Sequence, residues 1–363
     1  MNQKKLKTAL IGLDEDGLNM LEALSKVDHF DLLAVADKNT KLTEKTAPLY
    51  NCEPYDDYRQ LIAQNQLDCL IVTGGIYSCD EYVKSAIKNK ANILKLAPAA
   101  RNFEEAVEFY RLAKSNKVRF TIANTYRFAK SFLKLDDFLR KGSLEQISVI
   151  TAQCCFAGRK HPMWQTDPKL GGGGVLLHNC YGIIDAILKN NPLPQQVYSV
   201  NTNYATDRKQ RQSLTEDVAS VTMKFGDTFF ANIVADKNTG EKIQLKIHSR
   251  DRIVTVTDSQ FAIADKLSRT IEKVFYNDTE LSRTVDLLEA FALSILSPEE
   301  HKFPNDISQD LKNMAVIEAA YLSARTSMPE QPERIIQISQ LESEIIWPTG
   351  NTIHGNKFPR INP

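Results

Sequence analysis

Short apolar segments alternate with amphipathic segments of helical period over the first third of the chain. Met20, Leu21 and Leu24 show this helical spacing directly after the first apolar segment. Continuous apolar strands that alternate with helices are typical of a parallel sheet with helices on both faces. The five predicted strands are LKTALIGL (6–13), DLLAVAD (31–37), LDCLIVTG (67–74), NILKLAP (92–98) and VRFTIAN (118–124).

The pattern changes near residue 128, where a predicted helix over 130–142 is followed by strands in series. Turn signals such as Asn238-Thr239-Gly240 separate these strands. The series predicts a large, mainly antiparallel sheet, and we expect helices at 175–189, 283–296 and 306–326 to cover it. Its predicted strands are 147–155, 196–204, 217–225, 228–236, 242–249 and 252–258.

These patterns together predict an α/β protein of two domains. Residues 1–126 are expected to form a Rossmann-like, doubly wound domain of the nucleotide-binding type. Residues 127–363 are expected to form an α+β domain that binds substrate and forms oligomers. A length of 363 residues agrees with two domains at roughly 150 residues each.

Composition narrows the classes of function. Lys plus Arg number 45 and Asp plus Glu number 45, so the net charge is zero. A balanced chain argues against nucleic-acid binding and against attraction to anionic membranes, because both need a basic excess. No apolar run reaches the ~18 residues of a transmembrane helix, and the N-terminal apolar stretch is too short for a signal peptide. We therefore expect a cytoplasmic protein with six reduced cysteines.

The loop after the first strand carries part of a dinucleotide-binding fingerprint. Gly12 and Gly17 fill the first and third positions of G-x-G-x-x-G, and Asp37 supplies the acid at the end of the second strand. The middle glycine is replaced by Asp14, and Glu15 and Asp16 add further negative charge where a phosphate would bind. Two interpretations remain open: a weakened nucleotide site, or a Rossmann loop that no longer binds a dinucleotide.

Six further segments stand in the order and on the elements of one known family. They are VTGG (72–75), ILKLAPAA (93–100), ANTYRF (123–128), WQTDPKLGGGG (164–174), TEDVASVTMKFGDT (215–228) and AVIEAAYLSAR (315–325). On these motifs the chain resembles the glucose–fructose oxidoreductase / inositol dehydrogenase / MocA (Gfo/Idh/MocA) family over about residues 5–330.

This resemblance implies an NAD(P)-dependent oxidoreductase that acts on sugar- or polyol-like compounds. It implies NAD or NADP as cofactor, held at Gly12, Gly17, Asp37 and Thr73. Such enzymes have a lysine in a Glu-Lys-Pro motif, and an aspartate and a histidine after the glycine run. Here those three positions are occupied by Ala97, His178 and Gly182, so the catalytic motifs are degenerate.

Two side chains are candidates to replace the lost acid/base groups. His178 is the stronger one, and a histidine held in the cleft by hydrogen bonds alone is the alternative. Lys95 lies two residues before Ala97, with a solvent-reaching or ion-paired lysine as the alternative. The other predicted cleft residues are Arg127, Trp164 and Asp185. For Arg127 the alternative is an ion pair at the domain junction, and for Trp164 it is ordinary packing. No residues stand at metal-ligand spacing, so no metal site is expected.

Two main functions therefore remain open. The first is NAD(P)-dependent oxidation with an altered acid/base set. The second, which Asp14, Ala97, His178 and Gly182 favour, is a non-catalytic descendant that binds a ligand or a partner subunit. Redox-neutral chemistry centred on His178 is a third possibility. In each case we expect a small-molecule ligand in the interdomain cleft. We also expect a homodimer or tetramer through the C-terminal sheet, whose outward positions include Val, Ile and Phe.

Overall fold

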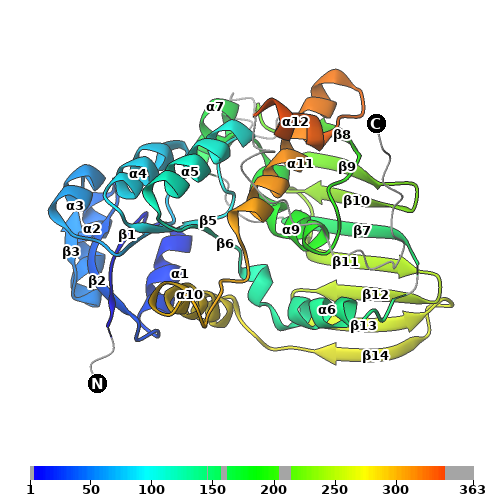
Figure 1. The fold of residues 1–363 in the computed structure, drawn as a ribbon, viewed down its shortest axis with the longest axis horizontal. Coiled ribbons are helices and arrows are strands. Elements are labelled where there is room, and N and C mark those ends of the chain that lie inside the picture. The colour runs from blue at the N-terminus through cyan, green and yellow to red at the C-terminus, as the bar shows by residue number, and fades with distance from the viewer. Residues whose placement is uncertain (1–3, 145, 157–161, 204–213, 340–363) are drawn as a thin grey trace.

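A computed structural model describes residues 4–144, 146–156, 162–203 and 214–339 (Figure 1). The N-terminal sheet has six parallel strands in the order β3-β2-β1-β4-β5-β6. Five of them confirm predicted strands, whereas the short β3 was not predicted. They are β1 (Leu6–Ile11), β2 (Phe30–Ala36), β3 (Glu53–Tyr55), β4 (Cys69–Val72), β5 (Asn92–Leu96) and β6 (Phe120–Ala123).

Helices cover both faces of this parallel sheet. On one face lie α3 (Tyr58–Gln64), α4 (Ile76–Lys88) and α5 (Phe103–Asn116), and α2 (Thr40–Thr46) with η1 (Ala47–Tyr50) follows β2. On the other face α1 (Glu15–Leu24) packs beside α10 (Glu280–Leu296). The expectation that the helix near 283–296 covers the second sheet was wrong. Its residues Leu287, Leu288 and Phe291 are buried in the same core as Leu10 and Leu21 of the first domain.

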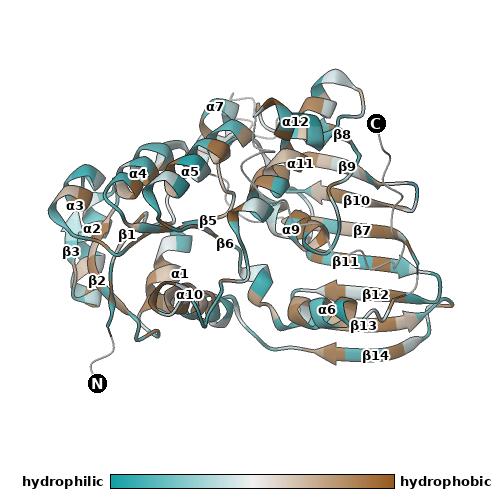
Figure 2. Cartoon of the chain, in the orientation of Figure 1, coloured by the Kyte–Doolittle hydropathy of each residue, from teal (hydrophilic) through white to brown (hydrophobic). Residues whose placement is uncertain are grey.

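The second sheet has eight strands in the order β14-β13-β12-β11-β7-β10-β9-β8. All neighbours are antiparallel except β7 and β10, which confirms a mainly antiparallel sheet. Its strands alternate between apolar and polar positions (Figure 2). The strands are β7 (Ile147–Phe156), β8 (Gln196–Thr202), β9 (Val218–Phe225), β10 (Phe229–Asp236), β11 (Glu241–Ser249), β12 (Arg252–Thr257), β13 (Gln260–Asp265) and β14 (Thr270–Phe275). The last two were not predicted.

One face of this sheet is covered by helices, which include α6 (Lys130–Arg140), α9 (Tyr181–Lys189) and α11 (Ile307–Thr326). The short α12 (Pro332–Ile338) packs on α11. The single helix predicted over 175–189 is divided into α8 (Val175–Asn179) and α9, because the chain turns at Cys180 (φ −97°, ψ −3°). His178 and Gly182 therefore lie on different helices.

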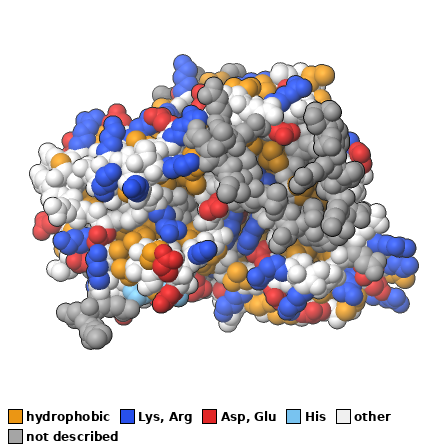
Figure 3. Space-filling view, viewed as in Figure 1, with side chains coloured by type: hydrophobic (Ala, Val, Ile, Leu, Met, Phe, Trp, Pro, Cys, Tyr) orange, Lys and Arg blue, Asp and Glu red, His pale blue; other side chains and the backbone are white. Residues whose placement is uncertain are grey.

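Charged groups are distributed as the zero net charge suggests. Lys and Arg side chains are interspersed with Asp and Glu over the face seen in Figure 3. In the described part of the chain, no helix has both the length and the apolar content needed to span a bilayer.

Candidate functional site between the two domains

The loops after β1 and β4 are in direct contact at the carboxyl edge of the parallel sheet. Gly12 has φ +104°, and a Cβ on it would lie 2.1 Å from the backbone nitrogen of Gly74. A Cβ on Gly17 would lie 2.0 Å from the carbonyl oxygen of Gly12. The hydroxyl of Thr73 donates a hydrogen bond to that same carbonyl at 2.7 Å. The glycines and Thr73 thus hold the loop geometry at the point where the strand order reverses, which is where open α/β sheets bind ligands.

Asp14 occupies the N-terminus of α1. Its carboxylate accepts a hydrogen bond from the N–H of Gly17 at 3.1 Å, and Glu15 and Asp16 follow in the first turn. Burial of the carboxyl group, together with the charges of Asp16 and Asp37, raises the pKa of Asp14. A phosphate at this helix end would seek the same N–H groups. It would also meet like charges, each pair of which costs about 1 to 4 kcal/mol at ~4 Å. These residues therefore fit a pyrophosphate poorly.

Asp37 ties two neighbouring loops together. One carboxylate oxygen accepts the N–H of Leu13 at 2.7 Å, and the other accepts the N–H of Asn39 at 2.8 Å. A carboxylate oxygen can accept more than one hydrogen bond, so these contacts leave capacity for a ribose hydroxyl. The predicted cofactor role of Asp37 stays a prediction.

Trp164 and His178 of the second domain meet Tyr77 of the first. The distance between ring centroids is 5.7 Å for Trp164 and Tyr77, and 5.4 Å for Trp164 and His178. Nε2 of His178 is 2.8 Å from the carbonyl oxygen of Gly171. Trp164 stands in η3 (Met163–Thr166), and Tyr77 stands in the first turn of α4. The structure therefore brings His178 and Trp164 together beside the loop after β4.

Gly182 has no room for a side chain. A Cβ on it would lie 2.3 Å from Cδ2 of Tyr126 and 3.1 Å from Oδ1 of Asn124. Tyr126 belongs to η2 (Thr125–Phe128), and its ring packs edge-on against Phe132. The ring of Tyr126 thus fills the space into which a larger residue at 182 would project.

Lys95 is buried rather than solvent-reaching, with 3% of its surface exposed. Its ammonium group donates to the carbonyl oxygens of Leu96 at 3.0 Å and Pro98 at 2.5 Å. Burial lowers the pKa of Lys95. The alternative of an exposed or ion-paired lysine was wrong, because the strand end provides carbonyl acceptors inside the protein. Its catalytic role stays a prediction.

Arg127 and Asp185 form a buried ion pair at the domain junction. Nε and Nη2 of Arg127 lie 2.7 and 2.6 Å from the two carboxylate oxygens of Asp185. The amides of Asn124 and Asn313 also donate to Asp185, each at 2.9 Å. The ion-pair alternative for Arg127 is confirmed. Both oxygens of the Asp185 carboxylate thus accept two hydrogen bonds each from groups inside the protein. Its role as a ligand-contacting residue stays a prediction.

A second buried carboxylate, Asp310 on α11, was missed in the sequence. Tyr181 donates its hydroxyl to Asp310 at 2.8 Å, and Asn305 donates its amide at 2.7 Å. Burial, with the charge of Asp185, raises the pKa of Asp310 to about 7. Burial lowers the pKa of Lys312 on the same helix to about 8. Polar residues in a long helix normally predict a face exposed to solvent. Nothing in the local sequence of α11 indicates that Asp310 and Lys312 are buried instead.

The glycine run 171–174 packs the two domains together. A Cβ on Gly172 (φ +77°) would lie 2.2 Å from the carbonyl oxygen of Arg101 in the first domain. The carboxylate of Glu216 accepts the N–H groups of Gly174 at 2.8 Å and Leu176 at 2.9 Å. This run is therefore a site of close backbone approach between the domains.

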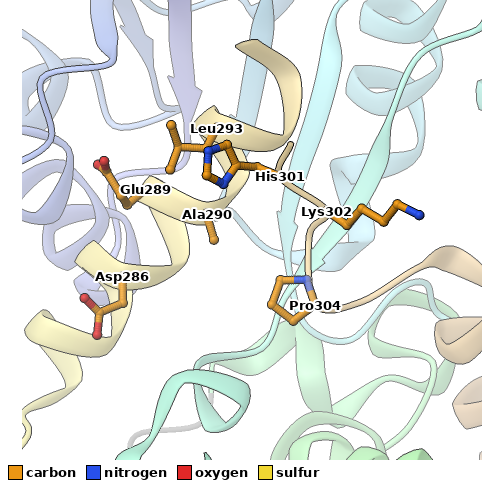
Figure 4. Close-up of a pocket in the computed structure, with 7 residues that line it drawn as sticks. All are labelled: Asp286, Glu289, Ala290, Leu293, His301, Lys302 and Pro304. Carbon is orange, nitrogen blue, oxygen red and sulfur yellow. The ribbon is translucent and has the colours of Figure 1, made fainter. Parts of the chain in front are cut away.

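Two cavities flank the domain junction. One of about 930 Å³ lies between the start of α5, the glycine run and α11. A smaller one of about 260 Å³ lies beside α10 (Figure 4). There the side chain of Lys302 points away from the carboxylates of Asp286 and Glu289. Polar groups do not converge in the smaller cavity. Among the described residues, no three His, Cys, Asp or Glu side chains cluster as metal ligands would.

Comparison with known proteins agrees with this architecture. Residues 6–124 match the model of an oxidoreductase family with an NAD-binding Rossmann fold. An uncharacterized oxidoreductase of Schizosaccharomyces pombe is 27% identical over 188 residues, which are 49% of this chain and 49% of that protein. An uncharacterized oxidoreductase of Synechocystis is 23% identical over 125 residues, or 33% of this chain and 34% of its own. The chain thus aligns with about half, or less, of the length of these curated relatives.

Solved structures share the fold over nearly the whole chain. Levoglucosan dehydrogenase in complex with NADH and levoglucosan is 15% identical, with a TM-score of 0.82, over 90% of this chain and 99% of its own. An Agrobacterium radiobacter oxidoreductase in complex with NAD+, L-tartaric acid and magnesium is 14% identical, with a TM-score of 0.78, over 92% and 100%. At this identity the likeness establishes the fold alone. The match of residues 6–124 to the family model and the shared fold both agree with the resemblance drawn from the motifs: the first domain matches the Rossmann domain of the Gfo/Idh/MocA oxidoreductases, and the chain as a whole shares the fold of solved oxidoreductases.

Proposed function

We propose that this protein binds a small polar ligand between its two domains and does not carry out the hydride transfer of its family. The observation that carries this proposal is the contact of Tyr126 with Gly182, which leaves no space for an acid/base side chain there. General acid–base catalysis contributes about 10²–10⁴ in rate, so its loss removes most of the family's chemistry. Ala97 cannot donate a hydrogen bond to a reacting hydroxyl.

The charge at the nucleotide loop supports the same proposal. Asp14 caps Gly17, and Glu15 and Asp16 stand in the same turn of α1. NAD or NADP is the cofactor that the family implies, and Gly12, Gly17, Thr73 and Asp37 would hold it. A bound nicotinamide would accept or donate the hydride. The acidic helix end opposes its pyrophosphate, so we expect little or no binding of either dinucleotide.

NAD(P)-dependent oxidation of a sugar or polyol is the second candidate function. It is favoured by the position of His178, whose imidazole lies beside Trp164 near the loop after β4. In this candidate His178 takes the hydroxyl proton in place of the missing residues. Its activity would fall on the acid side, because a protonated imidazole cannot accept a proton.

One experiment separates the two candidates. Purified protein is assayed for NAD⁺ and NADP⁺ reduction with a panel of inositols, aldoses and sugar acids, and NADH binding is measured by calorimetry. The proposal expects no reduction. Turnover that disappears in His178→Ala and persists in His301→Ala, an exposed control histidine, would establish the second candidate instead.

Assembly through the second sheet is part of the proposal. Four apolar side chains on the face of this sheet that no described helix covers are between 41% and 52% exposed, namely Tyr198, Val200, Phe230 and Val234. An antiparallel sheet with such a face is usually covered, and a second copy of the chain would bury these residues. We propose a homodimer or tetramer in a cytoplasmic setting.

A further inference from the structure

The described chain ends on the wall of the larger cavity, which has a volume of about 930 Å³. The apolar and terminal residues that line it include Leu322 of α11 and, in and after α12, Ile335, Ile338 and Ser339. The described part of its lining contains neither Trp164 nor His178. The cavity is therefore distinct from the candidate site beside the loop after β4.

Several apolar side chains at this cavity stay open to solvent among the residues that the structure describes. Ile338 is 83% exposed and Leu214 is 65% exposed. Ile335 and Leu322 are only half-buried. Large apolar side chains that are grouped around one cavity mark a surface that another segment or molecule covers.

Charged residues of both signs line the same cavity, and they do not select a charged ligand. Arg101 already has a carboxylate partner, with its Nη2 2.6 Å from Oε1 of Glu105. Arg325 lies 3.9 Å from Glu318, and both of these residues line the cavity. The exposed apolar side chains are therefore the better guide to what the cavity holds.

The sequence after Ser339 is apolar at matching positions. Leu341 and Ile345 come three and seven residues after Ile338, which is the spacing of one helix face. The apolar stretch ends at Trp347, because Pro-Thr-Gly follows it and such residues mark a turn. The segment 340–347 lies outside the described residues and begins directly at the cavity wall.

A hydrogen bond to the first domain fixes the point from which this segment starts. Nη2 of Arg111, on α5, donates to the carbonyl oxygen of Ser339 at 2.7 Å. A segment attached at the cavity wall is present there at an effective concentration on the order of millimolar. Weak apolar contacts are then enough to keep it bound, whereas a separate partner would have to compete with it.

We propose that the segment 340–347 of this chain docks into the cavity and covers its exposed apolar side chains. Leu341 packs against Ile338, and Ile345 packs against Leu322. Because the cavity lies between the start of α5 in the first domain and α11 and α12 in the second, the docked segment fastens the two domains together. This docking goes beyond ligand binding at the candidate site and does not depend on it.

Fluorescence of Trp347 in the intact chain tests the docking. In Trp164→Phe, Trp347 is the sole tryptophan. We expect acrylamide to quench it severalfold less than free tryptophan, because a docked segment is shielded from solvent. Adding Ile338→Asp, at an exposed position of the cavity wall, should raise the quenching constant toward that of free tryptophan. Leu49→Asp, at a residue of the first domain that is 76% exposed, is the matched control and should not change the quenching.

Three results would overturn the proposal. Quenching of Trp347 as strong as that of free tryptophan would show that the segment is not docked. Protection that survives Ile338→Asp would show that the segment is held somewhere else. Protection that is lost on dilution would show that a second copy of the chain supplies the contact.

Urea unfolding gives a second test, which needs no tryptophan substitution. Ile345→Ala and Leu322→Ala should each lower the unfolding midpoint. The double variant should lower it by less than the two shifts together, since either change already breaks the contact. Ile353→Ala, beyond the proposed segment, is the matched control and should leave the midpoint unchanged. Additive shifts would overturn the contact between residues 345 and 322.

Discussion

The ring of Tyr126 lies against the α-carbon of Gly182, with Cδ2 only 2.3 Å from where a Cβ would stand. Gly182→His should therefore destabilise the protein by about 1–3 kcal/mol or more through overpacking. In the Tyr126→Ala background the same change should cost much less, since the ring is gone. Urea unfolding of both single variants and the double variant measures this coupling, for which we expect about 0.5–3 kcal/mol.

Gly182→Ala in both backgrounds is the matched control, because it tests the first added carbon alone. Equal costs of Gly182→His with and without Tyr126 would show that the ring does not fill this space. The triple change Ala97→Lys, His178→Asp and Gly182→His should not restore activity. The new histidine at position 182 collides with the ring of Tyr126. The acidic residues at the start of α1 also remain and still oppose a dinucleotide.

The acidic turn of α1 should control dinucleotide affinity. Asp14→Asn, Glu15→Gln and Asp16→Asn remove the charge, while the asparagine retains the cap on Gly17. We expect NADH affinity to rise roughly tenfold, or about 1.4 kcal/mol, in the triple variant. Calorimetry at low and high salt checks the electrostatic origin, because salt should reduce the difference. Micromolar binding of NADH by the wild type would contradict the expected repulsion.

The ion pair of Arg127 and Asp185 should be essential for stability, because removal of either side chain leaves the other charged, buried and without its partner. Asp185→Asn or Arg127→Met should cost about 3–5 kcal/mol in unfolding free energy. The exposed pair of Lys141 and Asp137 is the control, and its loss should cost less than about 1 kcal/mol. Denaturant titration measures both. A loss near 1 kcal/mol at the buried pair would mean that solvent reaches this junction.

Asp310 should make the protein less stable as pH rises. Its pKa is about 7 in the folded state and about 3.9 when unfolded, so the folded state binds more protons between these values. Its contribution is complete below pH ~4 and is lost as pH rises to about 7, up to about 4 kcal/mol in order of magnitude. Lys312, with a pKa of about 8, stays protonated through most of this window. Burial raises the pKa values of Glu216 and Asp14 in the same direction, so only a difference between variants isolates Asp310.

Asp310→Asn should flatten this pH dependence and stabilise the protein at pH 8. The buried side-chain oxygen of Asn305 has no hydrogen-bond partner among the residues that the structure describes, and a rotation of this amide lets it accept from the new amide at 310. Asp227→Asn, at a carboxylate 98% exposed, is the control and should leave the profile unchanged. An equal slope in Asp310→Asn and wild type would sink this assignment.

The face of the second sheet that no described helix covers should be an interface. Phe230→Lys with Val234→Lys places two charges on that face of β10, where both residues are more than 40% exposed. We expect light scattering at micromolar concentration to give a dimer or larger for the wild type and a monomer for the variant. Leu49→Lys, at an exposed residue of the first domain, should not change the mass. A monomeric wild type would contradict the predicted assembly.

The sequence predicted the parallel sheet well because its strands are buried on both faces and read as continuous apolar runs. β13 and β14 were missed because they contain many polar or half-buried residues, such as Gln260 and Lys273, and so do not read as apolar runs. The position of α10 was not predictable either. Its apolar stripe identifies an amphipathic helix but not which of two sheets receives it.

The sequence identified candidate site residues better than it predicted their surroundings in the folded protein. Gly12 follows β1 and Gly17 lies in the first turn of α1, where the local fingerprint predicted them, and Thr73 follows β4, where the family resemblance implied it. The filling of the space at Gly182 by Tyr126, the enclosure of Lys95 by carbonyl groups and the burial of Asp310 depend on contacts between distant segments. Periodicity reports which face of an element is apolar, and it carries no information on such contacts.

The return of α10 to the first domain has a consequence for folding during synthesis. The chain leaves the parallel sheet after β6, builds β7 to β14, and only then supplies the helix that covers Leu10 and Leu21. A nascent chain of 126 residues would expose this apolar face, and such faces promote aggregation. The first domain therefore completes its core only after residues 280–296 have been synthesised, at nearly the same time as the second domain folds. A fragment cut at the boundary expected from the sequence would not be an independent folding unit.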